Sequence, residues 1–287
     1  MTLTLWRLTK KMKIRQEILS SRNNPLVKWA ALLSEKKERQ KSAAFLAEGE
    51  KLVFEAIKHK LPIMYIFISE SKKDKNIGGL TTALSDASFD ETEIIIVSDS
   101  AFEKISTEKA PEGIIAVIKH LDFFKKLDII YKEEFFVSNS ERCIALCSVR
   151  DPSNLGSVIR SAVAFGVDHI VVSSDSADIY NPKTVRSAMG NLFAVKISIV
   201  NDFSSFITAA RQSNRRVFAA ELRDGASSIK DIELLPTDIF VIGNEGHGIP
   251  EEISSVCTGS VYIPISERTE SLNASVAAAV FMWEQNK

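Results

Sequence analysis

The first 120 residues alternate short apolar runs with segments in which apolar residues recur at helical spacing. The runs have the length of strands and occupy residues 44–48, 63–69, 94–98 and 113–118. Between them, the helical pattern covers residues 26–39, 51–58 and 100–105, with Leu26, Trp29 and Leu33 on one face of the first. Strands that alternate with helices form a sheet covered on both faces. The pattern therefore predicts a small α/β/α sandwich over residues 18–119.

The second half of the chain shows the same alternation. Strand-length runs lie at residues 143–149, 169–173, 194–199, 216–220, 239–242 and 261–263, with helical segments at 183–189, 203–213 and 272–283. This order predicts a mostly parallel sheet in a second α/β domain, over residues 143–287. Residues 120–142 are charged and aromatic, and we expect a partly helical linker there. Residues 1–17 are expected to form an N-terminal extension to which we assign no role.

A polar turn joins the strand at residues 143–149 to the next helix, in the stretch DPSNLGSVIRSAVAFG at 151–166. Asp151-Pro152 ends the strand, and Ser153 or Asn154 is expected to cap the helix. In open parallel sheets, ligands bind beyond the carboxyl ends of the strands. Arg160 lies off the apolar stripe of this helix. Taken alone it is more typical of a solvated helix surface than of a phosphate clamp.

Two further strands end in polar segments. The stretch VIGNEGHGIP at residues 241–250 places three glycines after an apolar strand, and glycine lets the backbone approach a ligand closely. The spacing is not GxGxxG, so it supports dinucleotide binding only weakly. We expect His247 to be an exposed loop residue. After the strand near residue 263, Ser271 or Asn273 caps an alanine-rich helix. Three such strand ends predict one composite pocket.

Composition narrows the class of protein. Of the 287 residues, 45% are apolar and 25% are charged, as in ordinary globular proteins. Three cysteines without CxxC spacing indicate core thiols rather than a disulfide frame or a zinc site. The sequence contains neither a transmembrane run nor a secretory signal. Residues 1–60 hold fourteen Lys and Arg against six Glu, which favours a solvated charged helix but also fits a polyanionic partner.

The residues of the predicted pocket resemble a known family. NLGSVIRSAVAFG at 154–166, GNEGHGIP at 243–250 and ESLNASVAAA at 270–279 look like the three ordered motifs of the SpoU, or TrmH-type, branch of the SPOUT RNA methyltransferases. NPKTVRSAMGNLF at 181–193 resembles the segment between the first two motifs. SRNNPLVKWAALLSEKKER, FLAEGEKLVFEA and EKAPEGIIAV in the first half are similar to the L30e-like substrate-binding domain that is often fused to these enzymes. The resemblance implies a SPOUT domain with a deep trefoil knot.

The resemblance also implies a cofactor and a reaction. The family binds S-adenosylmethionine through the second and third motifs, here at Gly243, Asn244, Gly246, Ile263, Ile265, Leu272 and Asn273. It methylates ribose 2′-hydroxyls of RNA, and the catalytic positions carried over are Arg160, Asn154, Glu245, Ser271 and Asn273. Family proposals make the arginine a base. The very high pKa of a guanidinium favours electrostatic stabilisation instead, and the sequence leaves both roles open.

We expect ribosomal RNA as the substrate, because the L30e-like fusion is typical of enzymes that act there, with transfer RNA as the alternative. The family also implies a homodimer. The unpaired cysteines indicate a reducing, cytoplasmic compartment and no metal site, and the lack of a long apolar run predicts no membrane contact. The candidate RNA contacts are Arg22, Lys28, Lys36, Lys37 and Arg39. A catalytically silent RNA-binding protein and a nicotinamide-dependent enzyme are the competing interpretations. Retention of the motif residues argues against the first, and the missing GxGxxG argues against the second.

Overall fold

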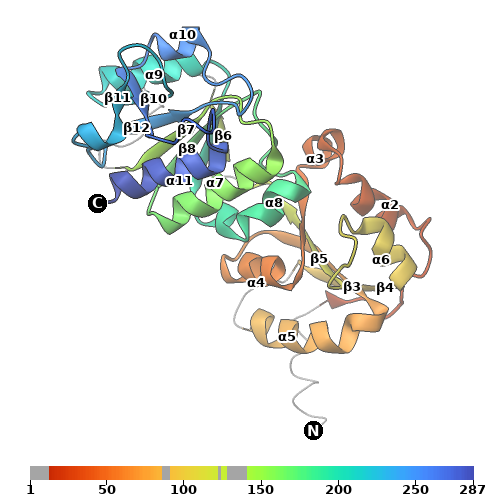
Figure 1. The fold of residues 1–287 in the computed structure, drawn as a ribbon. Coiled ribbons are helices and arrows are strands. Elements are labelled where there is room, and N and C mark those ends of the chain that lie inside the picture. The colour runs from red at the N-terminus through yellow and green to blue at the C-terminus, as the bar shows by residue number, and fades with distance from the viewer. Residues whose placement is uncertain (1–12, 86–90, 122–123, 128–140) are drawn as a thin grey trace. The chain divides into compact units, whose positions relative to one another are not determined.

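The structure is a computed structural model that describes residues 13–85, 91–121, 124–127 and 141–287 (Figure 1). The chain divides into two compact units. The N-terminal unit comprises Met1–Leu121 and Tyr180–Phe193, and the C-terminal unit comprises Asp122–Ile179 and Ala194–Lys287. Each unit contains its own sheet.

A five-stranded sheet forms the centre of the N-terminal unit, in the order β1-β4-β3-β5-β2. Strand β5 runs antiparallel to both neighbours, whereas β1, β4 and β3 are parallel. Its strands are β1 (Lys13–Ile14), β2 (Ala44–Glu48), β3 (Ile63–Ser69), β4 (Glu93–Val97) and β5 (Ile114–Lys119). Its helices are α2 (Pro25–Leu32), α3 (Lys36–Ser42), α4 (Glu50–Lys58), α5 (Lys73–Ser85), α6 (Asp99–Ile105) and α8 (Pro182–Ala188), with the 3-10 helices η1 (Glu70–Lys72) and η2 (Asn191–Phe193).

Helices cover both faces of this sheet. Val27 and Ala30 of α2 pack with Phe102 of α6 in one apolar core, against Phe67 and Ile95 of the strands. Helices α4 and α5 contact each other on the other face (Figure 1). The expected α/β/α sandwich is confirmed. Strand β1 adds an edge to the sheet from residues that we expected to be an extension.

The single helix expected over residues 26–39 is two helices, α2 and α3. Helix α2 ends at Leu32 because the guanidinium of Arg39 donates hydrogen bonds to the carbonyls of Leu33 at 2.9 Å and Ser34 at 2.7 Å. These carbonyls lie at the end of a helix, where the last peptide oxygens lack intrahelical donors. The chain therefore turns at residues 33–35 and begins again as α3.

Residues 180–193 pack within the N-terminal unit, although the sequence placed them in the second domain. The ring of Tyr180 stacks on Phe45 of β2 at 4.6 Å and on His120 at 4.2 Å, and its hydroxyl accepts the Leu121 N–H at 2.8 Å. Phe193 also lies against Phe45. These contacts join residues about 60 or more positions apart, so local periodicity does not reveal them.

The C-terminal unit contains an eight-stranded sheet in the order β11-β13-β10-β12-β7-β8-β9-β6, and every neighbouring pair is parallel. Its strands are β6 (Phe124–Leu127), β7 (Cys143–Leu146), β8 (His169–Ser173), β9 (Lys196–Val200), β10 (Val217–Ala220), β11 (Ser227–Ser228), β12 (Ile239–Ile242) and β13 (Gly259–Tyr262). Its helices are α7 (Pro152–Ala164), α9 (Phe203–Gln212), α10 (Glu251–Ser254) and α11 (Ala274–Gln285), with the 3-10 helix η3 (Ile229–Asp231).

Two pairs of helices cover this sheet. Phe206 and Ile207 of α9 and Ile253 of α10 share a core with one face of the central strands. Helices α7 and α11 pack together, and Phe281 of α11 stacks on Phe240 of β12 at 4.6 Å (Figure 1). The predicted parallel sheet is thus confirmed, and the trefoil knot stays a prediction. Within the expected linker, residues 124–127 form the edge strand β6, while residues 122–123 and 128–140 lie outside the described residues.

Candidate active site

The first motif begins with a helix cap. Asp151 is the N-cap of α7, because its Oδ1 accepts the N–H groups of Ser153 at 2.8 Å and Asn154 at 2.9 Å, with Pro152 at the first helical position. The sequence predicted Ser153 or Asn154 as the cap, and that prediction is wrong. An aspartate followed by proline is itself a typical helix start. With Asp151 in this role, the Asn154 side chain is left for contacts beyond the strand end.

The second motif is a tight turn after β12. Asn244 N donates to Gly248 O at 3.0 Å, and Gly248 N donates to Asn244 O at 2.9 Å. The Asn244 side chain braces this turn from inside, since its Oδ1 accepts Gly246 N at 2.9 Å and His247 N at 3.1 Å. Its Nδ2 donates to the carbonyl of Ser148 at 2.9 Å, which ties the turn to the end of β7. His247 is exposed.

Residues from all three motifs form one hydrogen-bonded chain. Asn273 Nδ2 donates to Asn154 Oδ1 at 3.0 Å, and Asn154 Nδ2 donates to Glu245 Oε1. Asn273 is also the N-cap of α11, with its Oδ1 accepting Ser275 N at 2.9 Å. Strands β7 and β12 are neighbours in the sheet, so Asn154 and Glu245 follow adjacent strand ends. Three of the five predicted catalytic residues are therefore in contact.

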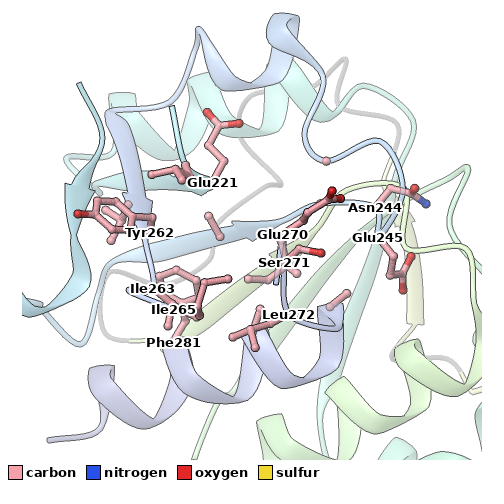
Figure 2. A pocket seen from close by; sticks show the side chains of 18 residues that line it. Glu221, Asn244, Glu245, Tyr262, Ile263, Ile265, Glu270, Ser271, Leu272 and Phe281 are labelled. Carbon is pink, nitrogen blue, oxygen red and sulfur yellow. The ribbon is translucent and has the colours of Figure 1, made fainter. Parts of the chain in front are cut away.

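A cavity of about 290 Å³ opens beside this chain (Figure 2). Its walls come from the ends of β10, β12 and β13, from the loop before α11 and from α11 itself. An apolar group beside α11 lines one side of the cavity and consists of Ile263, Ile265, Leu272 and Phe281 (Figure 2). Glu221 and Glu245 lie at opposite ends of the cavity (Figure 2). Of the predicted cofactor positions, the cavity is lined by Gly243, Asn244, Ile263, Ile265 and Leu272.

The remaining predicted residues lie around the cavity in different ways. Gly246 and Asn273 are outside the set of described residues that line it. Gly246 bonds to Asn244, which lines the cavity, whereas Asn273 bonds to Asn154 and Ser275, which do not. Ser271 lines it and is exposed. Arg160 is exposed on α7, and within the described part of the chain its guanidinium makes no hydrogen bond or ion pair. The structure thus groups the polar chain with the cavity and leaves Arg160 in solvent.

Sequence reasoning missed several residues that line the cavity, among them Glu221, Tyr262, Glu270 and Phe281. Glu221 directly follows β10, and its Oε1 accepts hydrogen bonds from Ser254 and, at 2.8 Å, from Ser260. An acidic residue after an apolar strand was the available signal. That signal does not place Glu221 at the cavity unless the strand order is known, because the order sets β10 between β12 and β13.

The cysteines do not line the cavity. The three cysteines are free and buried, and burial raises the pKa of Cys143 and Cys257 to about 12 and that of Cys147 to about 11. They are inert core thiols, as expected. Among the residues that the structure describes, no cluster of His, Cys, Asp and Glu could hold a metal ion. No helix in the same ranges is long and apolar enough to cross a membrane.

The predicted RNA contacts lie in the N-terminal unit. Arg22, Lys28, Lys36 and Lys37 are exposed, so their charges are available to a ligand. Arg39 is only 2% exposed, and its guanidinium binds the carbonyls that follow α2. Its prediction as an RNA contact is therefore wrong. A buried arginine that binds peptide oxygens has a structural role, which a run of basic residues does not reveal.

Comparison with known proteins agrees with this arrangement. Residues 141–283 match the profile of the SpoU rRNA Methylase family, and residues 24–116 match that of the MRM3-like substrate binding domain. The chain belongs to the SpoU methylase family. This SpoU family member resembles the 23S rRNA (guanosine(2553)-2′-O)-methyltransferase RlmP of Bacillus subtilis, with 28% identity over 93% of this chain and 98% of RlmP.

Two further relatives span nearly the whole SpoU family chain. The 23S rRNA (uridine(2479)-2′-O)-methyltransferase of Streptomyces viridochromogenes is 26% identical to this chain. The match covers 93% of this chain and 90% of the Streptomyces protein. The crystal structure of an rRNA methyltransferase from Sinorhizobium meliloti with bound AdoMet (S-adenosylmethionine) is 25% identical. It superposes with a TM-score of 0.80 over 95% of this chain and 97% of that one.

Proposed function

We propose that this protein transfers a methyl group from S-adenosylmethionine to a ribose 2′-hydroxyl of ribosomal RNA. The observation that carries the proposal is the joining of three family motifs at one cavity, through the chain Asn273–Asn154–Glu245. The relatives named above, which methylate 23S rRNA at the 2′-oxygen, support it. A catalytically silent RNA-binding protein would not need these side chains to remain in contact.

The cavity suits S-adenosylmethionine in its chemistry. Ile263, Ile265 and Leu272 offer apolar walls for a flat adenine ring, while Glu221 and Glu270 supply negative charge near a ligand with sulfonium and ammonium groups. Bound there, the cofactor supplies an electrophilic methyl group whose carbon–sulfur bond breaks as the new carbon–oxygen bond forms. The chain's own residues would hold that ligand and orient the RNA.

The ribose hydroxyl gives its proton to solvent as its oxygen attacks the methyl carbon, and negative charge builds on that oxygen in the transition state. We assign Arg160 the role of stabilising that charge and binding an adjacent phosphate. A guanidinium is effectively always protonated and is therefore a poor base. Its exposure and freedom from partners within the described chain support this role. Glu245 and Asn154 hold the first two motifs together, and Asn273 joins them to the third, from which Ser271 lines the cavity.

The decisive experiment replaces Arg160 by alanine and by lysine. We expect Arg160→Ala to lower the methylation rate by about 100-fold or more, the effect of removing one oxyanion donor, with unchanged S-adenosylmethionine affinity. Arg160→Lys keeps the charge and should recover part of the rate. Isothermal titration calorimetry measures the affinity, and radiolabelled methyl transfer measures the rate. Wild-type turnover in Arg160→Ala would overturn the assignment, and absence of cofactor binding to the wild type would overturn the proposed function.

We also propose that the protein acts as a homodimer through α7 and α11. Trp283 is 53% exposed and Val276 is 48% exposed, one above the other on α11, and Phe165 contacts Trp283 edge-on at 5.9 Å. Large apolar side chains in contact at a surface are typical of a protein interface. Light scattering coupled to gel filtration should give twice the chain mass. Val276→Asp should halve it, whereas a wild-type monomer would contradict the dimer.

The choice of ribosomal over transfer RNA rests on the named relatives and on the domain fused to the cavity. Arg22, Lys28, Lys36 and Lys37 supply charge for binding a phosphate backbone. A ribosomal substrate also fits the expected cytoplasmic location. Nucleotide-resolution mapping of 2′-O-methyl groups, with and without the gene, tests the choice. Loss of one site in large-subunit rRNA would agree, and loss of a site in tRNA would contradict it.

A further inference from the structure

A polar network outside the cavity joins the end of β8 to the end of β7. Asp175 lies in the turn after β8, and its Oδ2 accepts the hydroxyl of Ser148 at 2.6 Å. Its Oδ1 accepts the hydroxyl of Ser173 at 2.6 Å, and Ser173 Oγ in turn accepts the N–H of Ser148 at 2.8 Å. Ser176 Oγ accepts the next N–H, that of Val149, at 3.1 Å. The turn after β8 therefore holds both the backbone and the hydroxyl of Ser148.

Ser148 needs such support because its backbone is left-handed, with φ at 56°. A residue with a side chain pays about 1 kcal/mol or more for this conformation, and it persists where the surroundings enforce it. The conformation has a consequence for the cavity, because the carbonyl of Ser148 accepts the amide of Asn244 at 2.9 Å. Asn244 lines the cavity and braces the turn of the second motif.

We infer that Asp175 is a positioning residue for the cofactor site, acting through Ser148 and Asn244. Its carboxylate fixes the left-handed Ser148, whose carbonyl then fixes the Asn244 amide and the glycine-rich turn. Neither Asp175 nor Ser148 belongs to the described residues that line the cavity, so the effect on the ligand is indirect. The inference rests on the proposed binding of S-adenosylmethionine and adds a residue that none of the three motifs contains.

The charge state of Asp175 agrees with this role. Partial burial raises its pKa, but hydrogen bonds from Ser148 and Ser173 outweigh that effect and leave the pKa below its ordinary value. The carboxylate therefore stays ionised near neutral pH and acts purely as an acceptor. Arg150 lies 3.5 Å from Asp175 Oδ2, with 64% of its side chain exposed. It approaches Asp175 without touching Ser148 in any hydrogen bond that the described residues show, which makes it a matched control.

The test uses Asp175→Ala, Ser148→Ala, Ser148→Gly and the double variant Ser148→Gly/Asp175→Ala, with Arg150→Ala as control. Isothermal titration calorimetry measures the affinity of each variant for S-adenosylmethionine and for S-adenosylhomocysteine. Loss of the charge-assisted hydrogen bond between Asp175 and Ser148 should weaken binding by about threefold to tenfold in Asp175→Ala, with turnover at saturating cofactor within about twofold. Arg150→Ala should bind like the wild type, because exposed ion pairs contribute little.

Glycine at position 148 separates positioning from general stability. Glycine adopts positive φ without strain, so Ser148→Gly should bind better than Ser148→Ala, the reverse of the usual preference for alanine over glycine. In the glycine background, Asp175→Ala should weaken binding by less than about twofold. An equal loss in both backgrounds, or full affinity in Asp175→Ala, would overturn the inference. A wild type that binds neither ligand would instead overturn the proposed function, and should Asp175→Ala fail to fold, the two variants at position 148 decide.

Discussion

The turn of the second motif has no room for a side chain at Gly243. A Cβ built there would lie 2.6 Å from the carbonyl carbon and oxygen of Gly248 and 2.7 Å from Cγ1 of Ile249. Two of these three neighbours are backbone atoms, so the turn itself would have to open. Gly246 stands three residues later in the same turn, and its Cβ would meet only Asn244 Oδ1, at an ordinary 3.6 Å. The two glycines form a matched pair.

Gly243→Ala should therefore damage the cofactor site, while Gly246→Ala should not. Overpacking of this kind costs about 1–3 kcal/mol. The free turn can relieve the strain by breaking the pairing between Asn244 and Gly248, and ligand binding must then restore it. At about 1.4 kcal/mol per tenfold change in affinity, the dissociation constant for S-adenosylmethionine should rise by about 5- to 150-fold. Gly246→Ala should stay within about threefold of the wild type.

Calorimetry on both variants measures this difference, and circular dichroism confirms that each is folded. Equal affinity of Gly243→Ala and the wild type would refute the reasoning. That result would mean that the turn opens at no cost or that the ligand does not depend on it. Equal losses in both variants would also refute it, because they would show a response to any methyl group in the turn. The pair thus tests the geometry of the turn separately from its glycine content.

Three further predictions follow from buried or bridging groups. Burial lowers the pKa of His169 to about 4, although Glu141 opposes the shift. The folded state thus resists protonation, and stability should fall as pH drops from about 6.5 towards 4, by about 2 kcal/mol at pH 5. Urea unfolding at pH 7.5 and 5 should show a smaller fall in His169→Gln, and an identical fall would contradict this. Arg39→Ala should lower stability by about 1.5–3 kcal/mol in thermal unfolding. Lys37→Ala should keep that stability and lower the salt dependence of RNA binding, and the opposite pattern would restore Arg39 as an RNA contact. Asn273→Asp keeps the helix cap but cannot donate to Asn154, so turnover should fall by about tenfold at unchanged melting temperature; wild-type turnover would show that this bond is dispensable.

Hydrophobic periodicity located most of the elements. The buried strands β3 and β12 and the helix α9 lie close to their predicted bounds, because each has an apolar pattern that local sequence displays. Periodicity failed where a polar side chain ended a helix and where a distant strand paired with a segment. Arg39 ends α2 through its own side chain, and β6 joins the sheet by pairing with β9, some 70 residues later. Neither event changes the spacing of apolar residues.

The sequence likewise predicted some features of the site and missed others. Glycine and asparagine at strand ends marked the turn of residues 243–248 correctly, because those residue types are needed where the backbone bends sharply. The role of Ser148 could not be predicted, because a left-handed serine looks like any other serine in the sequence. Glu221 was missed for a different reason. Its place on the cavity depends on the sheet order, and parallel strands give no local indication of their neighbours.

The strand order alone does not bring the third motif to the first. Strand β13, which precedes the third motif, is separated from β7 by β10 and β12. The third motif reaches the first because α11 packs against α7 and sets its N-cap, Asn273, beside Asn154. Aromatic contacts hold α11 in this place, with Trp283 on Phe165 at the end of α7 and Phe281 on Phe240 of β12. The polar geometry of the site is therefore fixed by aromatic contacts along a helix, and a change in those contacts would move Asn273 without touching any motif.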